Sequence, residues 1–160
     1  MFKKVLIIMS LGIIVLAASS YYFFKDEILN NHTIASGATT EKSIRIADHR
    51  IKVMIADEPR QQTQGLSGRT YLAHDEGMLF IFPQTGTYTF WMKDMLFALD
   101  MIWIDDNGRI IAIDKTVPPE SFPKTFSPPS PIKYVLEVNA GWSNSNNVQI
   151  GDSMTGLLLK

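Results

Sequence analysis

A membrane-length apolar segment begins this chain and leaves only the residues after it to build a folded domain. Val5 to Phe24 form a run of 20 residues that is broken only by three serines and one glycine. As a helix, such a run is ~30 Å long, which matches the hydrocarbon thickness of a bilayer. No polar face interrupts it, so a buried helix of a soluble domain is the weaker interpretation.

The charges that flank this segment predict its orientation. Lys3 and Lys4 precede it, whereas residues 25–27 behind it are net negative. Under the positive-inside rule, the N-terminus stays in the cytoplasm and the rest of the chain is exported. We therefore expect residues 1–25 to be a single-pass anchor in the cell membrane, with the domain on the outer side. A signal peptide cleaved near Ala17 and Ser19, which would release a secreted protein, is the alternative.

Composition narrows the classes of partner and cofactor. The chain has 15 basic and 16 acidic side chains, and three lysines precede Asp26, so the remainder carries 12 basic against 16 acidic. This acidic body argues against a nucleic-acid partner, because such proteins need a basic surface that displaces counterions. The chain has no cysteine, which excludes disulfides, thiolate catalysis and cysteine-bound metals. Methionine sulfur can bind Cu(I), but methionine is also a common core filler, and we expect no metal and no cofactor.

The rest of the chain divides into a tether and one domain. Residues 26–43 lack a hydrophobic period and predict a flexible tether. Residues 44–160 contain short apolar segments separated by turn signals, and their length suits a single domain. Short strands with one short helix predict a mostly β (β-rich α+β) fold, which is a compact small barrel or sandwich.

The first half of the domain predicts a hairpin, a helix and a strand. Segments 43–47 and 51–55 alternate apolar and polar residues, as two paired strands do. Two acids followed by proline, with glycine at the end, predict a two-turn helix over residues 57–65. The apolar run 77–82 predicts a strand that Pro83 ends.

The second half of the domain predicts further strands around a stiff loop. Strands are predicted at 88–93, 99–104, 109–113 and 133–138. Asn107-Gly108 predicts a type I′ turn, because this dipeptide accepts positive φ angles. Residues 117–131 contain six of the eight prolines, so we expect a surface loop without a helix or a central strand.

Charged side chains within apolar segments are the candidate site residues. Burying such a charge alone is costly, so each one must be paired or line a cleft. Trp91 and Lys93 alternate with the apolar Phe90 and Met92, which leaves one aromatic and one cationic side chain free to contact a ligand. We expect a ligand-binding surface formed by Arg69, Trp91, Lys93, Asp94, Asp100 and Glu137.

Two other interpretations of these charges remain open. The first is a structural network of ion pairs, with Lys93 bound to Asp100 and Arg69 bound to Glu76 or Glu137. The second is catalysis, for which Asp100 and Glu137 are the weak candidates. Two carboxyl groups that flank one bond can hydrolyse a glycosidic linkage.

Several blocks of this sequence occur in the order seen in a known family. They are 64–69, 75–80, 90–94, 99–104, 134–141 and 151–152. In this order they resemble the family catalogued as domain of unknown function 192, over about residues 44–159. The resemblance implies a compact β-rich domain, often behind a signal or an anchor, and it implies no activity.

Together these features predict an extracytoplasmic, membrane-anchored binding or accessory domain. Its partner, besides the membrane, would be a cell-envelope polysaccharide, a peptide or a protein. The alternative is a small hydrolytic enzyme that acts on envelope polysaccharide or peptide through the paired carboxyl groups. We favour binding over catalysis.

Overall fold

The domain is built on one seven-stranded sheet. The structure is a computed structural model, and it describes residues 42–156. The strand order is β6-β5-β8-β3-β2-β1-β9, and neighbours are antiparallel except for β2 and β3, which are parallel. The strands are β1 (Lys42–Ile46), β2 (His49–Ala56), β3 (Glu76–Gly86), β5 (Leu99–Ile104), β6 (Ile110–Val117), β8 (Ile132–Asn139) and β9 (Met154–Thr155).

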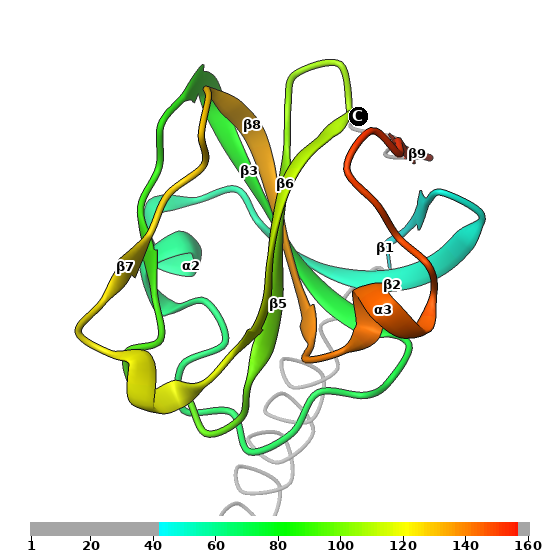
Figure 1. The fold of residues 1–160 in the computed structure, drawn as a ribbon. Coiled ribbons are helices and arrows are strands. Elements are labelled where there is room, and N and C mark those ends of the chain that lie inside the picture. Colours follow the sequence, from blue (N-terminus) through cyan, green and yellow to red (C-terminus); the bar gives the residue numbers. More distant parts are fainter. Residues whose placement is uncertain (1–41, 157–160) are drawn as a thin grey trace, which may run out of the picture. The chain divides into compact units, whose positions relative to one another are not determined.

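The sheet curls until its two edges meet (Figure 1). An isolated antiparallel bridge joins Arg109, beside β6, to Ser153, beside β9. The backbone N–H of Met154 also donates to the carbonyl of Gly108 at 2.7 Å. The two edges therefore satisfy part of each other's hydrogen bonding, and the strands enclose a barrel-like interior.

The central strands bury side chains on both faces, which gives two separate cores. Alternate residues of a strand point to opposite faces of the sheet. The inner core, inside the curl, includes Leu79, Ile102 and Leu136. The outer core, on the opposite face, includes Phe80 and Trp103. Because both faces are covered, all six residues of β5 are buried.

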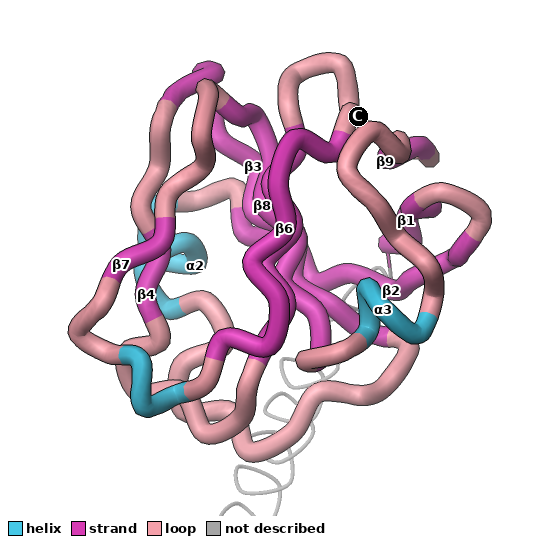
Figure 2. The backbone as a smooth tube through the Cα atoms, in the orientation of Figure 1, coloured by secondary structure: helices cyan, strands magenta, loops and turns pink. Residues whose placement is uncertain are grey.

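A second layer covers the outer core. It consists of the helix α2 (Pro59–Gln64) and a two-stranded sheet of β4 (Phe90–Trp91) and β7 (Thr125–Phe126). Figure 2 shows this strand pair as a ribbon separate from the main sheet. The proline-rich segment supplies β7 and a 3-10 helix, η1 (Pro119–Ser121). A last helix, α3 (Trp142–Ser145), contributes Trp142 to the inner core.

The expected mostly β fold is confirmed, and three local predictions need correction. The hairpin of β1 and β2, the helix α2 and the hairpin of β5 and β6 occupy their predicted segments. Pro83 does not end β3, which continues to Gly86 with an irregular register against β8 beyond Ile81. The helix α3 was not predicted, and the proline-rich segment does contain a short 3-10 helix, η1, whereas its strand β7 has two residues and is not a central strand.

The predicted type I′ turn between β5 and β6 is wrong. That turn needs positive φ at both central residues, whereas only Gly108 has it, at 79°. Gly108 N–H instead donates to the Asp105 carbonyl at 3.2 Å. The Asp105 carboxylate accepts from the N–H groups of Asn107 and Arg109 at 2.9 and 2.8 Å. The acid at the start of the loop therefore selects a different turn, because its side chain bonds to the backbone ahead of it.

The predicted membrane segment lies outside the described residues, as does the predicted tether up to residue 41. Within residues 42–156, no helix combines the length and the apolar character that crossing a membrane requires.

Candidate functional site

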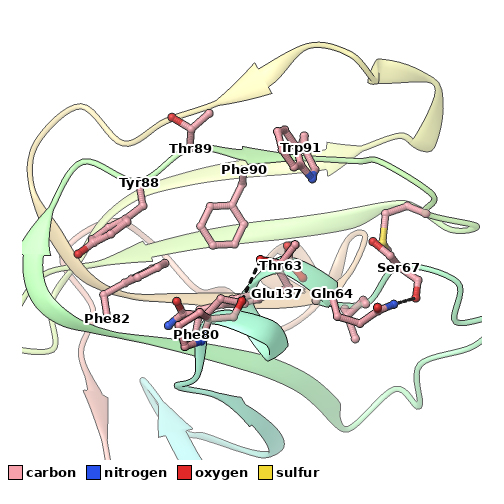
Figure 3. Close-up of a pocket in the computed structure, with 15 residues that line it drawn as sticks. Thr63, Gln64, Ser67, Phe80, Phe82, Tyr88, Thr89, Phe90, Trp91 and Glu137 are labelled. Atoms are coloured by element: carbon pink, nitrogen blue, oxygen red, sulfur yellow. Dashed lines mark hydrogen bonds between the residues drawn. The ribbon is translucent and has the colours of Figure 1, made fainter.

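A cavity of about 350 Å³ lies in the outer layer of the domain (Figure 3). Residues of α2, of the loop that follows it, of β3 and of β4 form its walls, and Glu137 of β8 reaches it from the central sheet. The volume falls at the lower end of the range for small-molecule sites.

The helix α2 has no buried residue, and several of its polar side chains line this cavity. A capping box between Glu58 and Gln61 begins the helix, and Pro59 occupies its first turn. Gln62 fixes it to the sheet, since its side-chain amide donates to the Ile81 carbonyl at 2.9 Å. Gln62 also lines the cavity, together with Thr63 and Gln64.

The loop after α2 is joined to the segment after β4. The Ser67 hydroxyl donates to the Lys93 carbonyl at 2.9 Å, and Gly68 N–H donates to the Asp94 carbonyl at 2.8 Å. Gly65 has a φ of 51°, and a Cβ atom there would lie 3.4 Å from the Phe80 ring. These contacts bring two of the sequence blocks, 64–69 and 90–94, to one wall of the cavity.

Aromatic rings form much of the wall. Phe82 and Tyr88 stack with ring centroids 3.5 Å apart, and Phe90 meets Phe80 edge-on at 4.9 Å. Figure 3 shows Phe90 extending from β4 toward Phe80 and Glu137. Trp91 completes the set and is 49% exposed, so it marks the side that is open to solvent.

Among the described residues, Glu137 is the only acidic or basic side chain that lines the cavity. It is 5% exposed, and its partners in the sheet are Met78 of β3 and Met101 of β5. Burial among these apolar groups raises the pKa of the Glu137 carboxyl to about 8. No hydrogen-bond donor or basic group within residues 42–156 compensates its charge.

A shallower outer hollow, of about 510 Å³, adjoins the cavity and shares five lining residues with it. Those shared residues include Ser67 and Trp91, whereas Arg60, Lys93 and Asp94 line the outer hollow alone. The structure therefore brings Trp91, Lys93 and Asp94 into one hollow and Trp91 and Glu137 into the other.

Asp100 lies elsewhere. It is fully buried and faces the inner core, on the opposite side of the sheet from Glu137. Its carboxylate accepts three backbone N–H bonds, from Thr116 at 2.8 Å, Gly141 at 3.0 Å and Ser143 at 2.9 Å. Asp100 and Glu137 therefore cannot flank one bond, as glycoside hydrolysis by a carboxyl pair requires.

The other predicted pairings are also absent among the described residues. Arg69 is exposed and lines neither hollow. Neither Lys93 nor Arg69 forms an ion pair within residues 42–156, and Glu76 accepts a 3.4 Å hydrogen bond from Ala73 N–H. Within the same range, no cluster of three or more acidic, histidine or cysteine side chains could hold a metal ion.

Sequence reasoning missed the wall of the cavity. The polar part of the wall has no charge and belongs to no catalytic motif; it consists of Gln62, Thr63, Gln64 and Ser67. The aromatic residues of β3 have the sequence pattern of ordinary core residues. The usable signal was the block 64–69 itself, because its Gly-Leu-Ser-Gly segment lies outside any predicted strand.

Solved structures similar to this chain include the following two. A putative transcription regulator from Sinorhizobium meliloti 1021 is 35% identical, with a TM-score of 0.70 over 74% of this chain and 95% of that one. A protein of unknown function from Novosphingobium aromaticivorans DSM 12444 is 26% identical, with a TM-score of 0.68 over 71% of this chain and 83% of that one. No curated protein matches the chain.

The model of one protein family matches residues 41–156, a range that contains both hollows and every strand described above. Its description is DUF192, an uncharacterized ACR. The match covers well over half of the sequence. The chain therefore belongs to the DUF192 family of uncharacterised proteins.

Proposed function

We propose that the domain is a binding module that takes a small ligand into the cavity through the outer hollow. The observation that carries this proposal is Glu137, a buried carboxyl group that lines the cavity and has no partner among residues 42–156. Burial without a compensating donor disfavours the charged form of such a group, which is expected where the group serves a bound ligand. The aromatic walls would supply contact area, and the polar side chains of α2 would orient the ligand.

Binding is favoured over hydrolysis because the cavity contains one carboxyl group and no second acidic or basic side chain. A lone acid that lacks a nucleophile or a base has little with which to activate water. The acidic excess after residue 25 also favours a small ligand over a nucleic acid, even though the similar Sinorhizobium protein is named as a regulator of transcription.

The same proposal includes a place of action. The apolar segment with Lys3 and Lys4 before it supports an anchored domain outside the cytoplasm. There the ligand would come from the cell envelope or the medium, as a free small molecule or as part of a polysaccharide, a peptide or a protein.

Methionine methyl groups provide a test of the cavity. Met95 lines the cavity, whereas Met154 lies in the inner core, so their ¹³C-methyl NMR signals report binding and a matched control. The full-length protein, purified in a mild detergent, would be screened against sugars, amino acids, short peptides, amines and carboxylates. We expect ligands to shift the Met95 signal and leave that of Met154 in place.

Two variants sharpen the screen. Trp91→Ala should weaken the binding of any ligand found, because it removes the ring that lines both the cavity and the outer hollow. Tyr71→Ala is the control, since Tyr71 is 70% exposed and lines neither hollow. Ligands that bind without shifting Met95, or that bind equally well to Trp91→Ala, would show that the cavity is not the binding site.

A further inference from the structure

We propose that the cavity binds an organic ammonium group, held with its positive charge against the Glu137 carboxylate and between the surrounding aromatic rings. This inference rests on the binding function proposed above and adds the chemical class of the ligand. Its first support is the charge inventory. The cavity lining contains one acid, no lysine, no arginine and no histidine, so no side chain there neutralises Glu137.

The walls are suited to a cation as well. Phe80, Phe82, Tyr88, Phe90 and Trp91 all line the cavity, and their ring faces carry negative electrostatic potential. The edge-on contacts of Phe90 with Phe80, at 83°, and with Trp103, at 88°, hold its ring in a defined orientation. An ammonium group that loses its hydration shell in such a place regains energy from the rings and from the carboxylate.

An anionic ligand fits the same site poorly. It would meet the ring faces and the carboxyl oxygens of Glu137, and the cavity lining offers it no cation. Arg60, Lys93 and Asp94 line the outer hollow but not the cavity. The cavity therefore selects the cationic end of a ligand, and the mixed charges outside contact the remainder.

Binding of a cation must be linked to loss of a proton. With a pKa of about 8, Glu137 is mostly protonated at pH 7 in the free domain. A bound ammonium group favours the carboxylate, so the carboxyl proton passes to the solvent as the ion pair forms. The affinity should rise about tenfold for each pH unit below 8 and level off above it.

Few other titratable groups face Glu137. Tyr88, next to β3, is the only one in the cavity lining, and the lining residues from α2 and the loop after it are uncharged. On β6, Asp114 pairs with Met101 in the sheet and already accepts a 2.8 Å hydrogen bond from the Trp103 indole. Among the described residues, the pH dependence of binding should therefore report on Glu137.

The experiment compares three small probes on the full-length protein. Choline carries a permanent positive charge, 3,3-dimethylbutan-1-ol is its uncharged isostere, and propionate carries a negative charge. Affinity would be measured by calorimetry and by the Met95 methyl shift at pH 6, 7, 8 and 9, and again with Glu137→Gln. Calorimetry in buffers of different ionisation enthalpy would count the protons released.

We expect choline to bind on the order of a hundredfold more tightly at pH 9 than at pH 6, with nearly one proton released at pH 7. The isostere should show no such dependence, and Glu137→Gln should bind choline and its isostere about equally. The pH series with the unchanged protein gives the answer even where Glu137→Gln does not fold.

The outcomes separate the ligand class from the site. If the isostere or propionate shifts Met95 more strongly than choline does, or if affinity falls as the pH rises, the cavity binds ligands but the ammonium proposal is wrong. If Met95 stays silent with choline at pH 9, the ammonium proposal also fails. If none of the three probes shifts the Met95 signal and the screen above finds no ligand for the cavity, the proposed binding function is wrong as well.

Discussion

The two faces of the central strands each bury one carboxyl group, and the two groups have opposite surroundings. Asp100 faces the inner core and accepts three backbone hydrogen bonds from β6 and from the start of α3. Glu137 faces the outer core and has no compensating partner among the described residues. Both side chains are at least 95% removed from solvent. Depth of burial therefore does not separate a structural carboxyl from a functional candidate, whereas the hydrogen bonds do.

The inner face is closed in the folded chain, and the outer face is not. The inner core is closed by the bridge between Arg109 and Ser153. The outer core is covered only by α2 and by two strands of two residues each, which leave a cavity and a hollow between them. A structural site maximises its internal contacts, whereas a binding site retains groups that a ligand can satisfy.

The largest effect should follow the loss of Asp100. In Asp100→Ala, three backbone N–H groups, of which that of Ser143 is buried and the other two are partly buried, lose a charged acceptor, which should lower the free energy of unfolding by roughly 5 kcal/mol. Asp100→Asn keeps one acceptor oxygen and should lose about half as much. Chemical denaturation of the two variants measures both values. A loss below about 1 kcal/mol in Asp100→Ala would contradict the view that Asp100 is structural.

The next effect concerns Glu137, whose ionisation should lower the stability of the folded domain, so that its replacement should stabilise the domain at high pH. Its pKa is about 8 in the folded domain, against an ordinary value of 4.5 for the unfolded chain, so between these values the folded chain binds more protons than the unfolded chain does. Stability should therefore be highest below pH 4.5 with respect to this group, fall from there to pH 8, and stay level above it. The total loss is roughly 5 kcal/mol.

Glu137→Gln should remove this dependence, because the amide has no charge to desolvate. At pH 9 we expect it to be more stable than the parent protein by roughly 3 kcal/mol, and at pH 5 to differ by about 1 kcal/mol or less. Urea unfolding across this pH range is the measurement. A parent profile that rises between pH 5 and pH 8, with no change in Glu137→Gln, would mean that the carboxyl group is compensated after all.

A third prediction tests the closure of the inner core. Gly108 has a φ of 79°, and a Cβ atom there would lie 2.8 Å from the Met154 carbonyl oxygen. Gly108→Ala should therefore cost roughly 2–3 kcal/mol, through backbone strain and separation of the two sheet edges.

Gly68 is the matched control for that variant. Its φ is 75°, but a Cβ atom there meets nothing within 4 Å, so Gly68→Ala should cost only about 1 kcal/mol. Thermal unfolding compares the two. Equal losses would show that the contact with Met154 does not matter to the closure.

Local sequence patterns predicted the elements better than they predicted the faces. Alternation over 43–47 and 51–55 identified the first hairpin because one side of those strands is less buried. The segment Leu99–Ile104 is buried on both sides, so its composition gives no sign of which way Asp100 points. That direction depends on the register of β5 against β8, which is a long-range property.

The candidate site was accessible to prediction only in part. Alternation around β4 correctly separated Trp91 and Lys93 from Phe90 and Met92, since the first two are exposed and Met92 is buried. The partner of Trp91 in the cavity is Glu137, which is 46 positions away in sequence and reaches the site from another strand. The turn at Asn107-Gly108 was mispredicted because the dipeptide rule ignores the side chain of Asp105.

The smallest effect should come from Lys93, at the edge of the outer hollow. Its side chain is exposed and forms no ion pair within residues 42–156, whereas its backbone carbonyl, which a substitution keeps, accepts the bond from Ser67. Lys93→Ala should therefore change the free energy of unfolding by less than about 0.5 kcal/mol. Ser67→Ala removes that bond and should cost about 1 kcal/mol, so it is the contrasting variant. A loss of several kcal/mol in Lys93→Ala would show that its ammonium group is part of the structure and that the outer hollow is not a free surface. With stability unchanged, any change in ligand affinity measured in Lys93→Ala can be assigned to the outer hollow.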